Sequence, residues 1–164
     1  MSSFPSEITS LHINCGGDEV NINNTNVYEG DIDKRGASTY YSAENWAFSS
    51  TGTFLDNSYP SDVYILSNMS SLQNISISDT ELYTKARTAA ISLTYYGLCL
   101  RNGNYNVRLH FAEIIFTQDN SFNSLGKRVF DIYVQVIQLL NCIIAKNERK
   151  KGQHDQKVMA TVAF

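Results

Sequence analysis

The chain has 164 residues, 43% of them hydrophobic and 18% charged, a balance typical of one folded globular domain and unlike that of a disordered protein. Its net charge is −3, and basic side chains gather after residue 145, so the body before that point is still more acidic. An acidic body repels phosphate backbones, which argues against the nucleic-acid-binding classes.

The first strand-like segment is residues 11–15, where apolar and polar side chains alternate before Gly16 and Gly17. This pattern predicts a half-buried strand that ends in a turn. Residues 18–61 are rich in Asn, Asp, Ser and Gly, with embedded aromatic side chains. That composition is typical of long loops that carry short strands.

Shorter features follow in the middle of the chain. Apolar runs at residues 63–66 and 75–77 predict two short strands, and residues 81–90 suggest a brief helical turn. Residues 90–95 alternate again and predict a longer strand.

A hairpin is predicted after this strand. Residues 98–100 could begin a pairing edge, and the Asn102-Gly103 pair that follows favours the positive φ angles of a tight turn. Residues 105–111 and 129–134 then alternate with a period of two. The side chains expected to face the core from the last of these strands are Phe130, Ile132 and Val134. Short strands separated by turn signals predict an all-β sandwich.

The character of the sequence changes after Gln135. Apolar residues then fall at helical spacing and are followed by a basic, polar end. We therefore divide the chain into residues 10–135, the β domain, and residues 136–164, a divergent tail that is helical and then disordered. The residues at helical spacing are Val136, Leu139, Leu140 and Ile143.

Two features favour an extracellular protein. Acceptor sequons for N-glycosylation begin at Asn23, Asn68 and Asn74. Cys15 and Cys99 each lie beside a strand-like run and can form a disulfide if those strands are neighbours; two buried thiols are the alternative. The sequence as it stands shows neither a secretory signal nor an apolar run long enough to cross a membrane.

The sequence gives little support for catalysis or for a cofactor. The three histidines share no ligand spacing, and Asp31 to Gly36 starts like a calcium loop but has Arg35 where an oxygen ligand is needed. Neither a nucleophile motif nor a Gly-rich phosphate loop is present. We therefore expect no metal, no cofactor and no enzyme activity.

The chemistry that remains is stacking of aromatic rings on the C–H face of a sugar, helped by a few polar groups. The alternative for each aromatic is that it fills the core of the sandwich. The candidate ligand-binding residues are Tyr40, Tyr41, Tyr95, Tyr96, Glu113 and Phe116.

Several motifs together resemble the malectin-like domain of plant leucine-rich-repeat receptor kinases. They are SLHINCGG (10–17), YYS (40–42) with NWA (45–47), YGLCLRNGNY (96–105), LHFAEI (109–114) and GKRVFDIYVQ (126–135). The match covers roughly residues 10–135, and the order of the motifs makes it specific.

This resemblance implies a jelly-roll-like β-sandwich of two antiparallel sheets, here incomplete at the C-terminus. It also implies a non-catalytic, carbohydrate-binding module on the extracellular side of a receptor whose kinase lies elsewhere. One aromatic of the family's sugar pocket matches Tyr40 or Tyr41. An aromatic pair matches Ile115 and Phe116, and another pocket tyrosine falls near Thr88.

Two alternatives to carbohydrate binding remain open. One is a protein-interaction module of a receptor complex, with a protein ligand or co-receptor as its partner and no sugar site. The other is a truncated, non-functional gene product, because residues 136–164 do not follow the family pattern. A membrane association is expected only through a parent segment outside this sequence.

Overall fold

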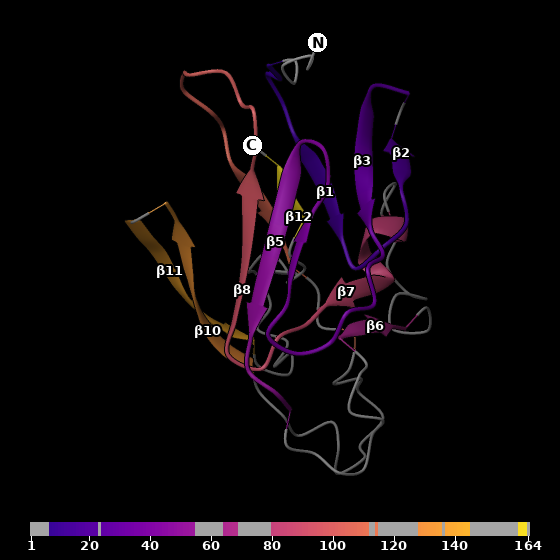
Figure 1. Ribbon diagram of the computed structural model, residues 1–164, viewed down its shortest axis with the longest axis vertical. Coiled ribbons are helices and arrows are strands. Elements are labelled where there is room, and N and C mark those ends of the chain that lie inside the picture. The colour runs from indigo at the N-terminus through magenta and orange to yellow at the C-terminus, as the bar shows by residue number, and fades with distance from the viewer. Residues whose placement is uncertain are drawn as a thin grey trace, which may run out of the picture.

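The computed structural model describes residues 7–22, 24–54, 64–68, 80–111, 114, 128–135, 137–144 and 161–163. Within these residues the regular structure is β-strand apart from one short 3-10 helix, as Figure 1 shows. The predicted all-β class is therefore confirmed. The strand expected at residues 75–77 lies outside the described residues.

The described strands in chain order are β1 (His12–Cys15), β2 (Val20–Ile22), β3 (Asn26–Asp31), β4 (Tyr40–Ser42), β5 (Trp46–Thr51), β6 (Ile65–Ser67), β7 (Lys85–Arg87), β8 (Ser92–Gly97), β9 (Arg108–His110), β10 (Arg128–Val134), β11 (Ile137–Ile144) and β12 (Thr161–Ala163). The 3-10 helix η2 (Thr80–Tyr83) precedes β7 and overlaps the start of the segment, residues 81–90, for which a helical turn was expected.

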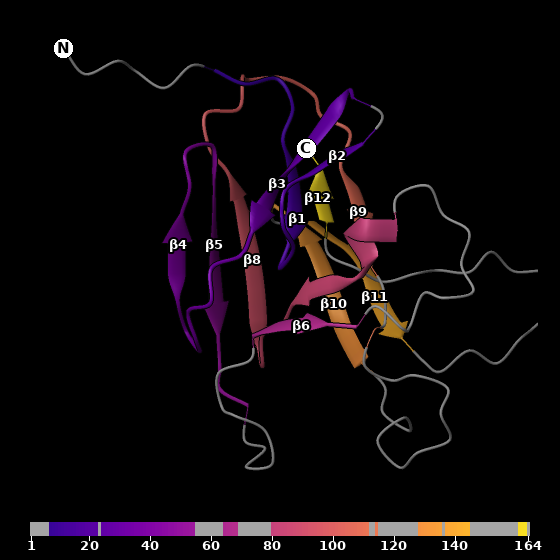
Figure 2. The ribbon, with the colours of Figure 1, turned by 90° about the vertical axis from the view of Figure 1, so that its right-hand side faces the viewer.

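Two larger sheets form the layers of the sandwich (Figure 2). One has five strands in the order β2-β3-β1-β12-β9, and the other has three in the order β4-β5-β8. Strand pairs β6-β7 and β10-β11 make two smaller sheets. Pairing is antiparallel throughout the described strands except between β1 and β3, which run parallel.

The main core lies between the two larger sheets. Ile13 and Cys15 on β1, with Leu11 just before it, pack against Trp46 and Phe48 on β5. Alternation along β5 explains this, because every second side chain turns to the same face. The inward row of β5 ends at Ser50, which is also buried.

A second apolar cluster covers the opposite face of the five-stranded sheet. Tyr28 on β3 and Leu82 on η2 form its buried centre. Strand β1 is therefore enclosed on both sides, and Asn14 is buried as fully as its neighbours. The half-buried strand predicted for residues 11–15 is instead a central strand with both faces covered.

The predicted hairpin at Asn102-Gly103 is wrong. Strand β8 ends at Gly97 and pairs with β5, whereas the next strand, β9, belongs to the five-stranded sheet. Residues 98–107 therefore connect two layers, and Gly103 does not adopt a positive φ.

The predicted C-terminal helix is also wrong. Residues 137–144 form strand β11, which pairs antiparallel with β10 through a turn at Gln135, whose φ is 55°. A short apolar run satisfies either a helix or a strand, and the open edge of β10 selects the strand. Residues 161–163 add β12 between β1 and β9.

Candidate ligand-binding surface

The two tyrosine pairs singled out in the sequence are divided between opposite faces of the three-stranded sheet. Tyr41 and Tyr95 both lie opposite Phe48, one on each side of it. Residues directly opposite each other in a sheet share a face, so these two rings point inward with Phe48. Their neighbours Tyr40 and Tyr96 therefore point outward.

The inward tyrosines pack as core residues. The Tyr41 ring lies 5.7 Å from the Trp46 ring and 5.9 Å from the Phe48 ring, measured between centroids. The Tyr95 ring lies at 6.0 and 5.9 Å from the same two rings. Such tilted aromatic contacts stabilise a core beyond the area that they bury. Neither Tyr41 nor Tyr95 is therefore positioned as a ligand platform.

The hydroxyl of Tyr95 belongs to a buried polar network that the sequence did not reveal. It donates a 2.5 Å hydrogen bond to Asp31 Oδ2, and Asp31 also pairs with Arg87. Burial, followed by smaller effects of Cys15 and Asp31, raises the pKa of Tyr95 well above its ordinary value. The phenol therefore remains protonated and serves as a donor.

The outward tyrosines are exposed to solvent. Tyr40 has a relative exposure of 59% and Tyr96 of 43%. Tyr96 lies opposite Ala47, and its hydroxyl is 3.0 Å from Ser49 Oγ, the next side chain along the same face of β5. The Tyr96 side chain therefore reaches from β8 over β5 to Ser49. Tyr40, on β4, lies directly opposite Ser49.

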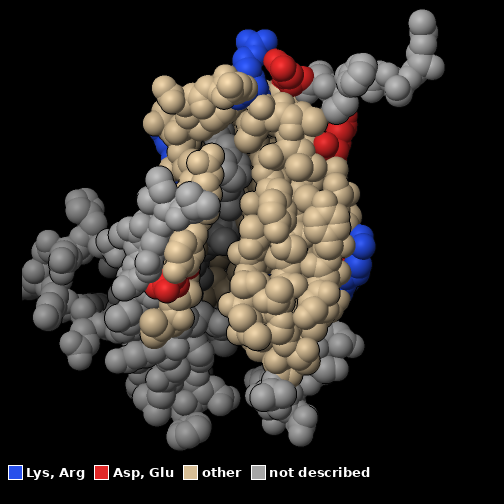
Figure 3. Space-filling view, turned by 60° about the vertical axis from the view of Figure 1, so that its left-hand side comes forward, with Lys and Arg blue, Asp and Glu red and all other residues tan. Residues whose placement is uncertain are grey.

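The rest of this outer face is uncharged and rich in hydroxyls. Figure 3 shows it as a broad surface with charged residues only at its margins. Ser49 and Thr94 were not predicted from the sequence, because only the pairing register brings them beside the two tyrosines. We call this the outer face; its residues are Tyr40, Ser42, Ser49, Thr51, Ser92, Thr94 and Tyr96, with the fully buried Ala47 beneath them.

Arg35, a cation at the edge of β4, has partners of its own. The Arg35 guanidinium bonds the Asp33 carboxylate at 2.9–3.0 Å and donates to the carbonyl oxygen of Tyr40 at 3.3 Å. It also lies 5.1 Å from the ring centroid of Tyr41. Arg35 thus links the edge of β4 to Asp33, and its charge is shared with that carboxylate.

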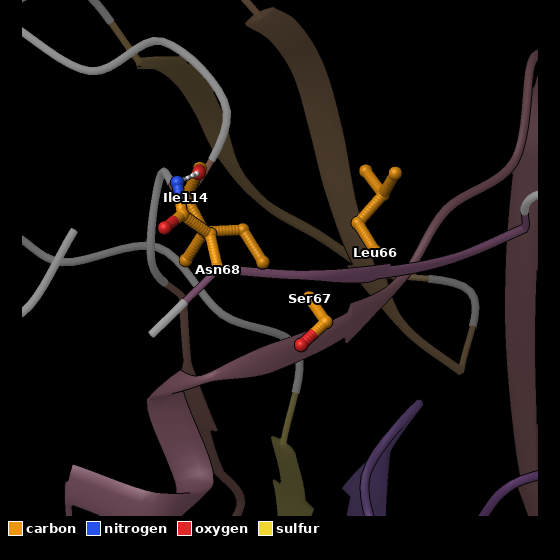
Figure 4. A pocket seen from close by; sticks show the side chains of 4 residues that line it. All are labelled: Leu66, Ser67, Asn68 and Ile114. Atoms are coloured by element: carbon orange, nitrogen blue, oxygen red, sulfur yellow. Dashed lines mark hydrogen bonds between the residues drawn. The ribbon is translucent and has the colours of Figure 1, made fainter. Parts of the chain in front are cut away.

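Other predicted site residues lie elsewhere. Glu113, Phe116, Asn23 and Asn74 lie outside the described residues. Asn68 follows β6 and lines a cavity of about 210 Å³ with Leu66, Ser67 and Ile114 (Figure 4). Its Nδ2 atom, the one that a glycan would modify, donates a 2.7 Å hydrogen bond to the carbonyl oxygen of Ile114.

The predicted disulfide between Cys15 and Cys99 is not formed in the structure. Cys15 is buried in the main core on β1, and its Sγ lies 3.9 Å from the carbonyl oxygen of Ile13. Cys99 lies in the connection after β8, with a φ of 58°. The strand expected at residues 98–100 is not formed, and that segment makes only an isolated bridge, from Leu100 to Ile8, ahead of β1.

The described part of the chain holds no cluster of His, Cys, Asp or Glu suited to a metal ion. Asp31 and Asp33, which looked like the start of a calcium loop, pair with Arg87 and Arg35 respectively. Among the described residues no helix has the length and hydrophobicity needed to cross a bilayer.

Comparison with known proteins places these features in a family. The model of the Malectin domain matches residues 9–163, and so extends past residue 135 into the tail. A probable LRR receptor-like serine/threonine-protein kinase of Arabidopsis thaliana is 55% identical over 128 residues, which is 76% of this chain and 13% of that protein. A second such kinase from the same plant is 49% identical over 150 residues, covering 90% of this chain and 15% of that protein.

The chain thus spans only 13% and 15% of the length of these two relatives. No solved structure gives a significant match.

Proposed function

Because the chain belongs to the Malectin domain family, we propose that it is an extracellular, non-catalytic module of a receptor-like kinase ectodomain and that it recognises carbohydrate. The relatives are receptor-like kinases by name, and the matched region is a small part of each. Any kinase activity would therefore belong to another part of a longer protein.

The outer face is the observation that carries this proposal. Two exposed tyrosine rings lie on a surface whose other side chains are mostly hydroxyls. Sugars present C–H faces that pack on aromatic rings and hydroxyls that exchange hydrogen bonds with Ser and Thr. The inward tyrosines and the ion pair of Asp31 with Arg87 hold this face rigid from beneath.

A second candidate function is recognition of a protein ligand or co-receptor. Strand β10 exposes Val129 at 70% and Tyr133 at 58%, and alternation places both on one face. Exposed apolar and aromatic side chains of this kind are common at protein interfaces. A sugar site and a protein interface on separate strands are compatible with each other.

A glycan array tests the proposed function. The full chain, secreted from plant cells, should bind a restricted set of immobilised glycans, and the Tyr40→Ala and Tyr96→Ala double variant should lose this binding while its circular dichroism is unchanged. Uniform silence of the folded protein on the array would favour the protein-interaction function instead.

The three sequons are proposed as N-glycosylation sites of the secreted protein. An asparagine amide keeps one N–H after glycosylation, so Asn68 can carry a glycan and still donate to Ile114. Mass spectrometry of the secreted chain before and after glycosidase treatment tests this; unmodified Asn23, Asn68 and Asn74 peptides would contradict it.

A further inference from the structure

We propose that the outer face binds an uncharged, extended polysaccharide chain that lies across strands β4, β5 and β8, with Tyr40 and Tyr96 as two stacking platforms. This inference rests on the proposed carbohydrate function and specifies both the site and the class of glycan.

The spacing of the platforms favours a chain of several sugar units. Tyr40 and Tyr96 lie on the outer two strands of the sheet, offset by two residues along the strand direction. Ordinary strand geometry then separates their Cα atoms by about 12 Å. Two platforms whose backbone positions are this far apart can contact successive units of one oligomer.

The hydroxyl between the platforms is already oriented. Ser49 lies directly opposite Tyr40 and is held by the Tyr96 hydroxyl at 3.0 Å. A second cross-strand pair, Thr51 with Ser92, is joined at 2.6 Å further along the same face. These bonds limit side-chain rotation, which lowers the entropy lost when a ligand binds.

The charge of the face selects an uncharged glycan. None of its residues is ionisable at neutral pH, and Arg35 beside it is bound to Asp33. A uronic acid chain would bring carboxylates onto a surface that offers them no cation, and they would lose hydration without compensation. An uncharged glucan or xylan carries no such cost.

The open shape of the face indicates recognition of internal chain units rather than of a chain end. It is the solvent-facing side of a three-stranded sheet, and Tyr40 and Tyr96 lie on the two flanking strands. One cavity among the described residues lies elsewhere, beside Asn68. Such a sheet surface contacts a chain along its length and does not enclose its end.

Affinity gel electrophoresis of the full chain tests the proposal. Gels contain a soluble glucan, a soluble xylan or polygalacturonate, and Tyr40→Ala, Tyr96→Ala and Tyr96→Phe are compared with the native chain. Ile32→Ala is the control, because Ile32 is as exposed as Tyr40, 58% against 59%, but lies just after β3, outside the three-stranded sheet.

We expect retardation by an uncharged polysaccharide and none by polygalacturonate. Each alanine variant on the face should weaken binding about tenfold or more, as for an aromatic hot spot. Tyr96→Phe should retain most of the affinity because it keeps the ring, and Ile32→Ala should bind like the native chain. Inhibition by free oligosaccharides should strengthen with chain length and then level off.

Three results would overturn the inference. Glycan binding that survives both alanine variants would show that the glycan binds elsewhere on the domain. A preference for polygalacturonate would show that the glycan is charged. Either result is compatible with the proposed carbohydrate function. Equal inhibition by a monosaccharide and by long oligomers would show that the site does not bind an extended chain. This measurement uses the native chain, so it holds even if a variant fails to fold. Failure to bind any of the three polysaccharides would count against the proposed function as well.

Discussion

The guanidinium of Arg87 on β7 binds the carboxylate of Asp31 on β3 with two hydrogen bonds, of 2.5 and 2.7 Å, in the interior of the domain. The side chains are 2% and 0% exposed. Arg87 also donates to the carbonyl oxygen of Asp33 and lies 4.1 Å from the centroid of the Phe48 ring. Burial disfavours the charged guanidinium, but its contacts with Asp31 outweigh that effect and raise the pKa of Arg87.

Removing one partner of this ion pair should destabilise the domain strongly. Arg87→Met leaves the Asp31 carboxylate buried without its cation, a change that typically costs about 3–5 kcal/mol. The double variant with Asp31→Asn should cost less than the two single changes together, because no unpaired charge remains. Urea denaturation followed by circular dichroism measures both.

The surface pair of Arg101 with Glu7 supplies the control. Both side chains are 66% exposed and 3.2 Å apart, so solvent screens their attraction. Arg101→Met should leave the denaturation midpoint unchanged. If Arg87→Met behaved in the same way, the buried pair would not be the structural link that we describe.

Two tyrosines that are adjacent in the chain should respond differently to loss of the hydroxyl. Tyr95→Phe removes a donor to the buried Asp31 carboxylate and should lower the free energy of unfolding by about 1–3 kcal/mol. Tyr96→Phe removes only an exposed contact with Ser49 and should change the free energy of unfolding by about 0.5 kcal/mol at most. Equal effects in thermal or urea unfolding would contradict the assignment of inner and outer faces.

Gly16 should tolerate no side chain. Its φ is 85°, and a Cβ atom would lie 2.4 Å from the backbone nitrogen of Arg87 and 2.6 Å from the carbonyl carbon of Ala86. Gly16→Ala should therefore destabilise the domain by roughly 1–3 kcal/mol from backbone strain alone, with the clash added. Gly103→Ala is the control, since its Cβ would meet nothing within 4 Å, and it should leave stability nearly unchanged.

His12 should make the domain less stable in mild acid. Burial, and then the charge of Arg108, lowers the pKa of this part-buried imidazole from 6.5. The unfolded chain therefore binds a proton more readily than the folded one, and stability falls as pH drops below 6.5 toward the folded-state pKa.

Urea denaturation at about pH 7.5 and about pH 5.5 measures this effect. His12→Gln should reduce the difference between the two conditions. Asp18 and Asp33, whose pKa values are lowered from 3.8 by Lys85 and Arg35, lose their contribution only in stronger acid. An unchanged pH dependence in His12→Gln would rule out this imidazole as the cause.

Local patterns in the sequence predicted the strands well where one face is buried. Along β10, Ile132 is buried whereas Val129 and Tyr133 are exposed, as their alternation indicated. The fold class follows from several such segments, and the family match agrees with the resemblance seen in the motifs.

The features that the sequence did not predict depend on contacts between residues that are distant in the chain. Asp31 and Arg87 are 56 residues apart, and nothing local to either marks them as partners. The Asn102-Gly103 pair is a genuine turn signal, but β8 already pairs with β5 and β9 with β12. The sequence likewise showed four candidate tyrosines without showing which two face solvent, because that depends on the pairing register.

We expect Tyr40 and Tyr96, and not Tyr41 and Tyr95, to contact an uncharged glycan. Nuclear magnetic resonance of the chain with carbon-13-labelled tyrosine rings tests it directly, by titration with soluble glucan and xylan oligomers. We predict that the ring signals of Tyr40 and Tyr96 shift together and saturate, while those of Tyr41, Tyr95 and Tyr133 do not move. Saturable shifts confined to other tyrosines, with Tyr40 and Tyr96 unchanged, would contradict the account.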